Sequence, residues 1–334
     1  MTYARVGVLM GGSSAEREIS LKTGTAVAAA LAREGREVVA LDLLPGEDVA
    51  KLILDAKIDA AFLALHGRHG EDGCVQGMLE LLQIPYTGSS VLSSALCMDK
   101  LKSKELFRLH NVPTPPYYEI QGADGHVDVE ETHGSFGFPV IVKPRREGSS
   151  VGVARANNLA ELARGAELAL EHDDSLLVER FISGKEIAVG ILDGRVLGAV
   201  EIAPKKGIYD YEAKYTPGMT DYFLPARLPP VRYRGVLNLA EQAARAVDAS
   251  GAVRVDLLVT EGQNEYVLEV NTLPGMTPTS LLPKIAQAAG YSFEDLCEAI
   301  LSTARLFVSS KRERSGVQPA VVAAPTSSDL KLAV

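Results

Sequence analysis

Strand and helix patterns alternate along the first 65 residues, and this alternation restricts the possible folds more than any other feature of the chain. Buried-strand patterns at Arg5–Met10, Glu37–Leu43 and Ile58–Leu65 are separated by helix patterns at Ala15–Arg33 and Val49–Ala56. A strand, a helix and a further strand form the unit of a parallel sheet that is covered by helices. We therefore predict an N-terminal α/β domain with a Rossmann-like parallel sheet, whose functional loops follow the carboxyl ends of its strands.

The pattern changes after a predicted helix at Met98–His110, which ends where the prolines of Asn111–Pro116 force an extended connection. Beyond it, one clear helix pattern at Leu159–His172 lies among strand patterns rich in β-branched residues, and Asp193-Gly194 is a hairpin turn signal. The strands are Phe138–Lys143, Val151–Ala156, Ser175–Phe181, Glu186–Leu192 and Val196–Ile202. This pattern predicts an α+β lobe with an antiparallel sheet.

A third unit is predicted after the polar stretch Pro204–Tyr222, which lacks periodicity and is typical of a long functional loop. The unit comprises a helix at Arg234–Ala249, a strand hairpin within Val253–Asn271, and helices near Ser280–Ala289 and Phe293–Ser309. We therefore divide the chain into domains 1–98, 99–203 and 204–310. The remaining residues, 311–334, are rich in Ser, Pro and Ala and are expected to form a disordered tail.

Composition and charge argue against several classes of protein. The chain has 334 residues, and 43 acidic against 34 basic residues give a net charge of −9, which disfavours a nucleic-acid-binding surface. No apolar run approaches the roughly 18 residues of a membrane span, and the N-terminus lacks the pattern of a secretory signal. Three widely spaced cysteines form no zinc pattern and fit a reducing compartment. We expect a cytoplasmic protein that binds neither nucleic acid nor a membrane.

A first glycine-rich segment, Gly11–Glu18, follows the first strand. Its backbone N–H groups could bind a phosphate, but Glu16 would place a negative charge there, which suits an ammonium group better. Alternatively, Ser13 and Glu16 form a capping box at the start of the next helix. The chain contains no G-x-G-x-x-G sequence, which argues against a nicotinamide enzyme of the usual type.

A second loop, His66–Gly73, follows the third strand and contains His66 and His69 beside two acidic residues. A metal site is the less favoured interpretation, because the two histidines lie in a flexible glycine loop rather than on one helix face. The position of the loop favours a role in framing a substrate pocket.

A third motif begins at Lys143, which ends a buried strand and is followed by the loop Gly148–Gly152. This loop could fold over phosphates with its N–H groups and hydroxyls, while Lys143 supplies a positive charge. The flanking strands and the sequence exclude a Walker A loop. The alternative is a solvated hairpin loop that contains basic residues.

The predicted hairpin carries the most specific geometry. If Gly262-Gln263 form a two-residue turn, Asp256 lies opposite Glu269 and Arg254 lies opposite Asn271, all on one face. Two carboxylates and an amide oxygen are ligands that suit magnesium. The alternative is a solvent-facing polar strand face on which Arg254 neutralises the acids.

The segment Thr272–Ser280 then leads from the hairpin into a helix. Its N–H groups and hydroxyls could bind a carboxylate at the helix start. Ser280 could equally serve as a helix N-cap, and the two roles are compatible.

Taken together, these motifs resemble those of the D-alanine–D-alanine ligases of the ATP-grasp superfamily, in order and over about Val6 to Phe307. The matching segments are Gly11–Glu18, Leu65–Gly73, Met98–Leu101, Arg146–Gly152, Tyr209–Tyr215, Arg254–Asp256 and Glu269–Met276. The resemblance implies a two-lobed ATP-grasp fold after the N-terminal domain. It also implies a homodimer that makes the D-alanyl-D-alanine of peptidoglycan, through a D-alanyl phosphate formed from ATP with two Mg²⁺ ions, for which Mn²⁺ can substitute.

The resemblance also implies roles for individual residues. Glu16 and His66 would hold the first D-alanine, Ser280 and Leu281 the carboxylate of the second, and Arg254 and the Gly275 N–H the oxyanion. Ser149 and Tyr215 would form a hydrogen-bonded set with Glu16. The metal ligands would be Asp256, Glu269 and Asn271. The ATP site would comprise Lys100, Lys143, Ser150, Glu179, Arg180, Phe181, Ile182, Glu186 and Lys214.

Two departures from the family pattern concern the periphery of the site. Arg180-Phe181 stands where relatives often have Trp or another large residue in the adenine wall, and His69 replaces a common Gly. A ligase for D-lactate or D-serine is the nearest alternative, although Tyr215 favours an amine acceptor. An inactive nucleotide-binding module is the alternative from another class.

Overall fold

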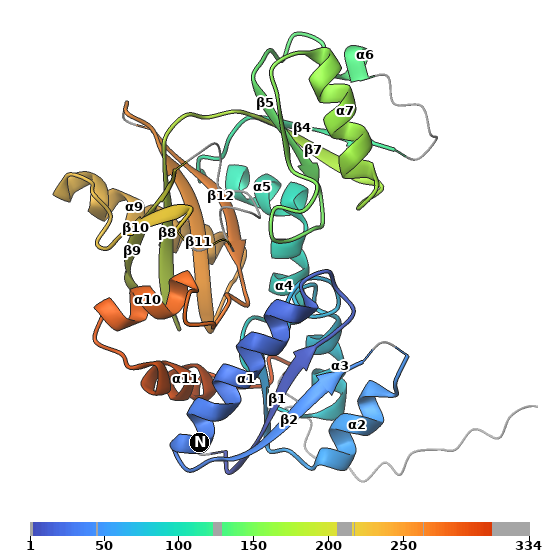
Figure 1. Cartoon of the computed structure of the whole chain (residues 1–334), viewed down its shortest axis with the longest axis vertical. Helices are drawn as coiled ribbons and strands as arrows, with labels where there is room; N and C mark the ends of the chain where they lie inside the picture. The colour runs from blue at the N-terminus through green and yellow to red at the C-terminus, as the bar shows by residue number, and fades with distance from the viewer. Residues whose placement is uncertain are drawn as a thin grey trace, which may run out of the picture.

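The computed structural model describes residues 3–44, 46–122, 129–205, 216, 218–262 and 264–308 (Figure 1). Lys214, Tyr215, much of the predicted loop Pro204–Tyr222 and the predicted tail 311–334 lie outside these residues. The described residues form one three-stranded, one four-stranded and one five-stranded sheet. None of the helices in the described part of the chain has the length and apolar character that crossing a membrane requires.

The N-terminal sheet is parallel, as predicted, with the strand order β2-β1-β3. β1 (Arg5–Gly11) is buried along nearly its whole length between β2 (Glu37–Leu43) and β3 (Ala60–Leu63), as expected for a parallel strand covered on both faces. The helices of this region are α1 (Arg17–Arg33), α2 (Val49–Ala56), α3 (Cys74–Leu82) and α4 (Val91–Met98). The sequence prediction did not include α3 and α4.

A small antiparallel sheet follows the extended connection after α5 (Lys100–Leu109), with the strand order β4-β7-β5-β6. Its strands are β4 (Tyr117–Gln121), β5 (Val140–Pro144), β6 (Ala154–Ala156) and β7 (Ser175–Arg180). Two helices belong to it, the short α6 (Val129–His133) and α7 (Leu159–Leu170), which packs on Val140 and Val142 through Leu162 and Ala166. An antiparallel sheet with a helix is present as predicted, but only three of the five predicted strands lie in it. The other two, Glu186–Leu192 and Val196–Ile202, belong to the five-stranded sheet.

The five-stranded sheet is antiparallel throughout, in the order β10-β9-β8-β11-β12. Its strands are β8 (Lys185–Leu192), β9 (Arg195–Pro204), β10 (Thr220–Phe223), β11 (Ala252–Val259) and β12 (Glu265–Asn271). α9 (Pro230–Ala246) packs on one face against Ile187 and Val189, and α10 (Leu281–Ala288) on the other against Ala188. The final helix, α11 (Phe293–Ser302), returns to pack on α1 and β1.

Three local predictions require correction. The last helix ends at Ser302 instead of Ser309, because Arg305 forms a bridge with Tyr86. The end of Pro204–Tyr222 is the strand β10, which pairs with β9. The predicted two-residue turn at Gly262-Gln263 is wrong as well. The N–H of Thr260 donates to the carbonyl of Asn264, so three residues lie between the paired positions.

The predicted pairing of the hairpin is nevertheless confirmed, because Asp256 lies opposite Glu269 and Arg254 opposite Asn271. A bulge between Asp256 and Leu257 shifts the register by one residue and compensates for the longer turn. The domain division stays a prediction. Strands β8 and β9 form hydrogen bonds with β11 and β10, in the same sheet as the hairpin.

Candidate active site

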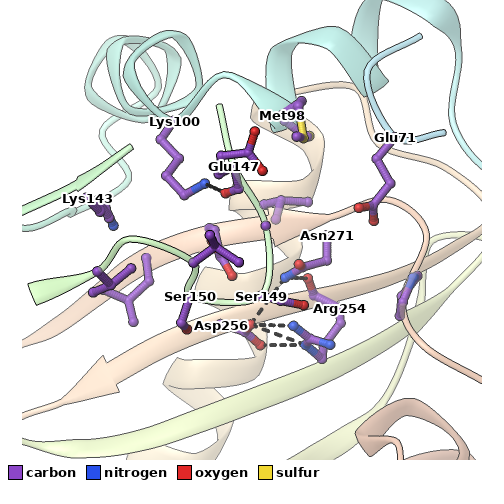
Figure 2. Close-up of a pocket in the computed structure, with 18 of the residues that line it drawn as sticks. Glu71, Met98, Lys100, Lys143, Glu147, Ser149, Ser150, Arg254, Asp256 and Asn271 are labelled. Atoms are coloured by element: carbon purple, nitrogen blue, oxygen red, sulfur yellow. Dashed lines mark hydrogen bonds and ion pairs between the residues drawn. The ribbon is translucent and has the colours of Figure 1, made fainter. Parts of the chain in front are cut away.

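A cavity of about 310 Å³ lies between the three sheets and collects residues from each predicted motif that the structure describes. The loop after β1 contributes Glu16, the loop after β3 contributes His66 and Glu71, and the hairpin contributes Asp256 and Glu269. Figure 2 shows side chains converging on this cavity from α5, from the β5–β6 loop and from the hairpin. Residues that the sequence places more than two hundred positions apart therefore form one site.

Glu16 lines the cavity where two glycine loops approach it closely. The Ser149 hydroxyl donates a hydrogen bond to Glu16 Oε1, across 133 residues of sequence. A Cβ atom at Gly148 would lie 2.5 Å from Glu16 Oε2, and one at Gly67 would lie 3.0 Å from the same oxygen. Only residues without side chains allow both loops to approach the carboxylate this closely.

The capping-box interpretation of Ser13 and Glu16 is wrong. Helix α1 begins at Arg17, and the Glu16 side chain makes no capping hydrogen bond to it within the described structure. The Ser13 hydroxyl lies 3.1 Å from His69 Nδ1 and connects the first loop to the second. The predicted proximity of Glu16 and Ser149, in contrast, is present.

His66 and Glu71 also line the cavity, and Glu71 lies close enough to Glu16 for their charges to interact. Burial and the charge of Arg254 lower the pKa of His66 to about 4, so its imidazole is neutral near pH 7. Its Nε2 lies 3.3 Å from the Thr23 hydroxyl. Burial and the charge of Glu16 raise the pKa of Glu71 to about 8, while the Gly67 N–H donates to Glu71 Oε2 at 2.7 Å.

Glu71 was not among the predicted site residues. The available signal was its place in a glycine loop that follows a strand carboxyl end, where polar side chains usually reach the site.

Among the described residues, His, Cys, Asp and Glu side chains form no cluster of three or more that could hold a metal.

Lysine side chains line the opposite part of the cavity (Figure 2). The Lys100 ammonium donates to the backbone carbonyl of Glu147. Lys143 of β5 and Lys104 of α5 each place Nζ 2.8 Å from the same oxygen, Glu179 Oε1. Burial alone would raise the pKa of Glu179, but the two lysine charges outweigh burial and lower it, so the carboxyl group is ionised. Burial lowers the pKa of Lys104 to about 8.

The predicted adenine wall also lines the cavity. Phe181 is held by its N–H, which donates to the Pro139 carbonyl at 3.0 Å, and the Arg155 guanidinium lies 4.1 Å from its ring centroid. The Arg180 guanidinium stacks on Phe136, at 5.1 Å from the ring centroid. Ile182 of this wall also lines the cavity, as do Ser150 and Glu186 of the predicted ATP site.

The predicted metal ligands of the hairpin line the cavity, and Asp256 is only 7% exposed. Arg254 donates to Asp256 through both Nε and Nη2, each at 2.8 Å, and Asn271 Nδ2 lies 3.2 Å from Asp256 Oδ2. Asp256, Glu269 and Asn271 thus place two carboxylates and one amide on a single wall. This hard-oxygen set fits magnesium, since waters and phosphate oxygens can complete its shell.

The start of α10 closes the last side of the cavity. The Thr277 N–H and hydroxyl lie 3.0 and 2.8 Å from the Ser280 hydroxyl. A Cβ atom at Gly275 would lie 2.9 Å from the same hydroxyl oxygen, so the backbone approaches Ser280 closely. Ser280 is the N-cap residue of α10 but makes no side-chain capping bond to the described helix. Its hydroxyl and the Leu281 N–H thus lie at a helix N-terminus, where an anion is favoured.

Comparisons with known proteins agree with this geometry. Family models described as D-ala D-ala ligase C-terminus and N-terminus match residues 106–302 and 43–89. A D-alanine–D-alanine ligase of Geotalea uraniireducens is 50% identical over 305 residues, which is 91% of this chain and 97% of that protein.

Solved structures of similar proteins are also ligases of this kind. A Bacillus anthracis D-alanine–D-alanine ligase complexed with ATP superposes with a TM-score of 0.78 and 37% identity, covering 90% of this chain and 97% of that one. The VanG D-Ala:D-Ser ligase of Enterococcus faecalis has a TM-score of 0.77 and 28% identity, with coverages of 90% and 99%.

The three sheets and the cavity between them define an ATP-dependent ligase of the ATP-grasp superfamily. Within this superfamily, the chain belongs to the D-alanine–D-alanine ligase family.

Proposed function

We propose that this protein uses ATP to join two D-alanine molecules into D-alanyl-D-alanine for peptidoglycan synthesis. One observation carries the proposal: Glu16, Arg254 and two lysines, Lys100 and Lys143, line a single cavity. A carboxylate suits the ammonium of an amino acid, lysines suit phosphates, and an arginine suits a developing oxyanion. ATP would phosphorylate the carboxylate of the first D-alanine, and the amine of the second would then displace phosphate.

The first D-alanine would bind beside Glu16, with its ammonium on the carboxylate that Ser149 contacts. Neutral His66 would help to position it, since burial keeps this imidazole uncharged. Arg254 and the Gly275 N–H would stabilise the oxyanion of the tetrahedral adduct. Ser280 and the Leu281 N–H would hold the carboxylate of the second D-alanine at the start of α10. Tyr215, which lies outside the described residues, would complete the set with Glu16 and Ser149.

ATP would extend from the adenine wall towards the lysines. The phosphates would contact Lys100, Lys143 and the Ser150 region, and Lys214 would add a charge from the segment outside the described residues. The adenine and ribose contacts would be Glu179, Arg180, Phe181, Ile182 and Glu186. Asp256, Glu269 and Asn271 would hold two Mg²⁺ ions, or Mn²⁺ in their place. These ions would neutralise phosphate charge.

Three further features belong to the proposal through family membership. They are a homodimeric state, a cytoplasmic location and the division into domains 1–98, 99–203 and 204–310. The alternative of a D-serine acceptor has support from the similarity to the VanG ligase, at 28% identity against 50% for the D-alanine–D-alanine ligase of Geotalea uraniireducens.

The activity test is release of ADP and phosphate by the purified protein with MgATP and D-alanine, with the product identified by mass spectrometry. We expect D-alanyl-D-alanine from D-alanine and no comparable ADP release with L-alanine alone. When D-lactate or D-serine competes with D-alanine as the acceptor, the dipeptide should remain the main product. A depsipeptide or a D-alanyl-D-serine product at equal rates would contradict the choice of acceptor. No ADP release with any of these would favour the inactive module.

Gly148→Ala is expected to raise KM for D-alanine by about tenfold or more, because the new methyl group would displace the Glu16 carboxylate by a fraction of an ångström. The change in KM for ATP should be smaller. The matched control is Gly235→Ala in α9, where an added Cβ would meet no atom within 4 Å. Equal effects on the two KM values would show that the glycine loop does not act through Glu16.

A further inference from the structure

Behind the cavity, Lys104 is buried in α5 and no role in the reaction has been assigned to it above. Its side chain is 0% exposed, and among the residues that line the cavity Lys104 is absent, whereas Lys143 and Glu179 are present. Lys104 therefore approaches Glu179 from the protein interior, while Lys143 approaches it from the cavity. The Lys104 ammonium also donates to the Thr114 hydroxyl at 2.5 Å.

The two lysines share a single acceptor. Both Nζ atoms lie 2.8 Å from Glu179 Oε1, and the exposed fractions of the Lys143 and Glu179 side chains are 11% and 4%. β5 and β7 place Lys143 and Glu179 on one face of the small sheet, because Ile141 pairs with Glu179 and Lys143 follows two residues later. One lysine would be enough to neutralise the single negative charge of Glu179. With Lys104 present, the carboxylate has two.

This surplus matters when nucleotide binds. A buried carboxylate that loses its only counter-ion is strongly disfavoured, so a lone lysine would stay on it. Lys104 remains in contact with Glu179 whatever Lys143 does, because Lys104 has no access to the cavity. Lys143 can therefore turn towards a phosphate without leaving Glu179 buried and uncompensated.

We propose that Lys104 is a positioning residue for ATP: it is the permanent counter-ion of Glu179 and thereby releases Lys143 to bind phosphate. This inference rests on the proposed contact between Lys143 and the ATP phosphates. It predicts that the effect of Lys104 is exerted on the phosphates and not on adenosine. It also predicts that the effect disappears when Glu179 carries no charge.

The test measures binding of MgATP and of adenosine by calorimetry, in the full chain. Lys104→Met should weaken MgATP binding by about tenfold or more, as for the loss of one charge-assisted contact. Adenosine binding and KM for D-alanine should change by less than about twofold. The matched control is Lys102→Met on the exposed side of α5, where Lys102 pairs with Glu105, and it should bind both ligands like the wild type.

A second comparison removes the charge of Glu179. In a Glu179→Gln background, adding Lys104→Met should change MgATP affinity by less than about twofold, because no buried charge then retains Lys143. This double variant leaves no buried carboxylate without a counter-ion, so it also provides the readout if Lys104→Met alone does not fold. The inference would be overturned if Lys104→Met lowered MgATP affinity tenfold in both backgrounds. Equal decreases in the affinities for MgATP and adenosine would also overturn it.

The role of Lys143 is checked separately. Lys143→Met should weaken MgATP binding and leave adenosine binding nearly unchanged. If it weakens neither, the proposed phosphate contact is wrong and the inference falls with it. If Lys143→Met is selective for MgATP but Lys104→Met is not, only the inference about Lys104 is wrong.

Discussion

Arg254→Lys is expected to lower kcat by about a hundredfold or more, although it preserves the positive charge. The guanidinium binds Asp256 through two parallel contacts of 2.8 Å, and these fix its plane against the cavity wall. A lysine ammonium cannot reproduce this fork, so it would not present a donor at the same place as the oxyanion develops. Steady-state kinetics with D-alanine and MgATP measure the effect, and KM for ATP should change by less than about threefold.

The matched control is Arg232→Lys. Arg232 of α9 also pairs with a carboxylate of this hairpin, since its Nε lies 2.9 Å from Glu265 Oε1, but Arg232 does not line the cavity. Its replacement should leave kcat within about twofold of the wild-type value. If Arg254→Lys also changes kcat by less than about threefold, Arg254 only neutralises Asp256 and the oxyanion is stabilised elsewhere.

Elements with strong periodicity and clear turn residues could be predicted from the sequence. β2 and α2 match their predicted bounds residue for residue, because Gly35 and Gly46 mark turns beside them. The parallel sheet and the antiparallel strand patterns follow from the same local signals. The division of the antiparallel strands between two sheets does not, because β8 and β9 pair with β11 and β10. The prediction fails where a contact with a distant part of the chain determines the local structure.

The hairpin illustrates this limit. Local turn chemistry at Gly262 predicts a two-residue turn, and the structure has three residues between Thr260 and Asn264. The pairing of Asp256 with Glu269 is still correct, because a bulge at the next position restores the register. No residue in β12 indicates that bulge from the sequence. The predicted pairing is therefore correct only because the longer turn and the bulge shift the register in opposite directions.

In the site, too, local motifs could be predicted from the sequence and contacts between distant residues could not. Glu16 looks like part of a capping box in its own segment, but its observed hydrogen bond comes from Ser149, 133 residues later. Lys104 resembles any lysine on the polar side of a helix, and its burial against Glu179 depends on how α5 packs on the small sheet. The motifs therefore located the cavity, while the contacts behind it required the structure.

The hairpin carboxylates lead to the second large expected effect. Glu269→Gln should lower kcat by about a hundredfold and raise the Mg²⁺ concentration needed for half-maximal rate, because one negative charge of the proposed ligand set is lost. Gln has nearly the shape of Glu, and Glu269 is only half-buried, so the fold should remain intact. The measurement is kcat across a Mg²⁺ titration, with Mn²⁺ binding followed by electron paramagnetic resonance as an independent readout.

Glu261→Gln is the matched control, since Glu261 lies exposed at the turn of the same hairpin and does not line the cavity. It removes the same charge from the same element and should change neither kcat nor Mn²⁺ binding. Arg254 already neutralises Asp256 in this structure, so the acids could be a self-compensated structural pair. Full turnover of Glu269→Gln at saturating Mg²⁺, with Mn²⁺ binding unchanged, would establish that alternative, because a ligand to the metal cannot lose its charge without weakening the site.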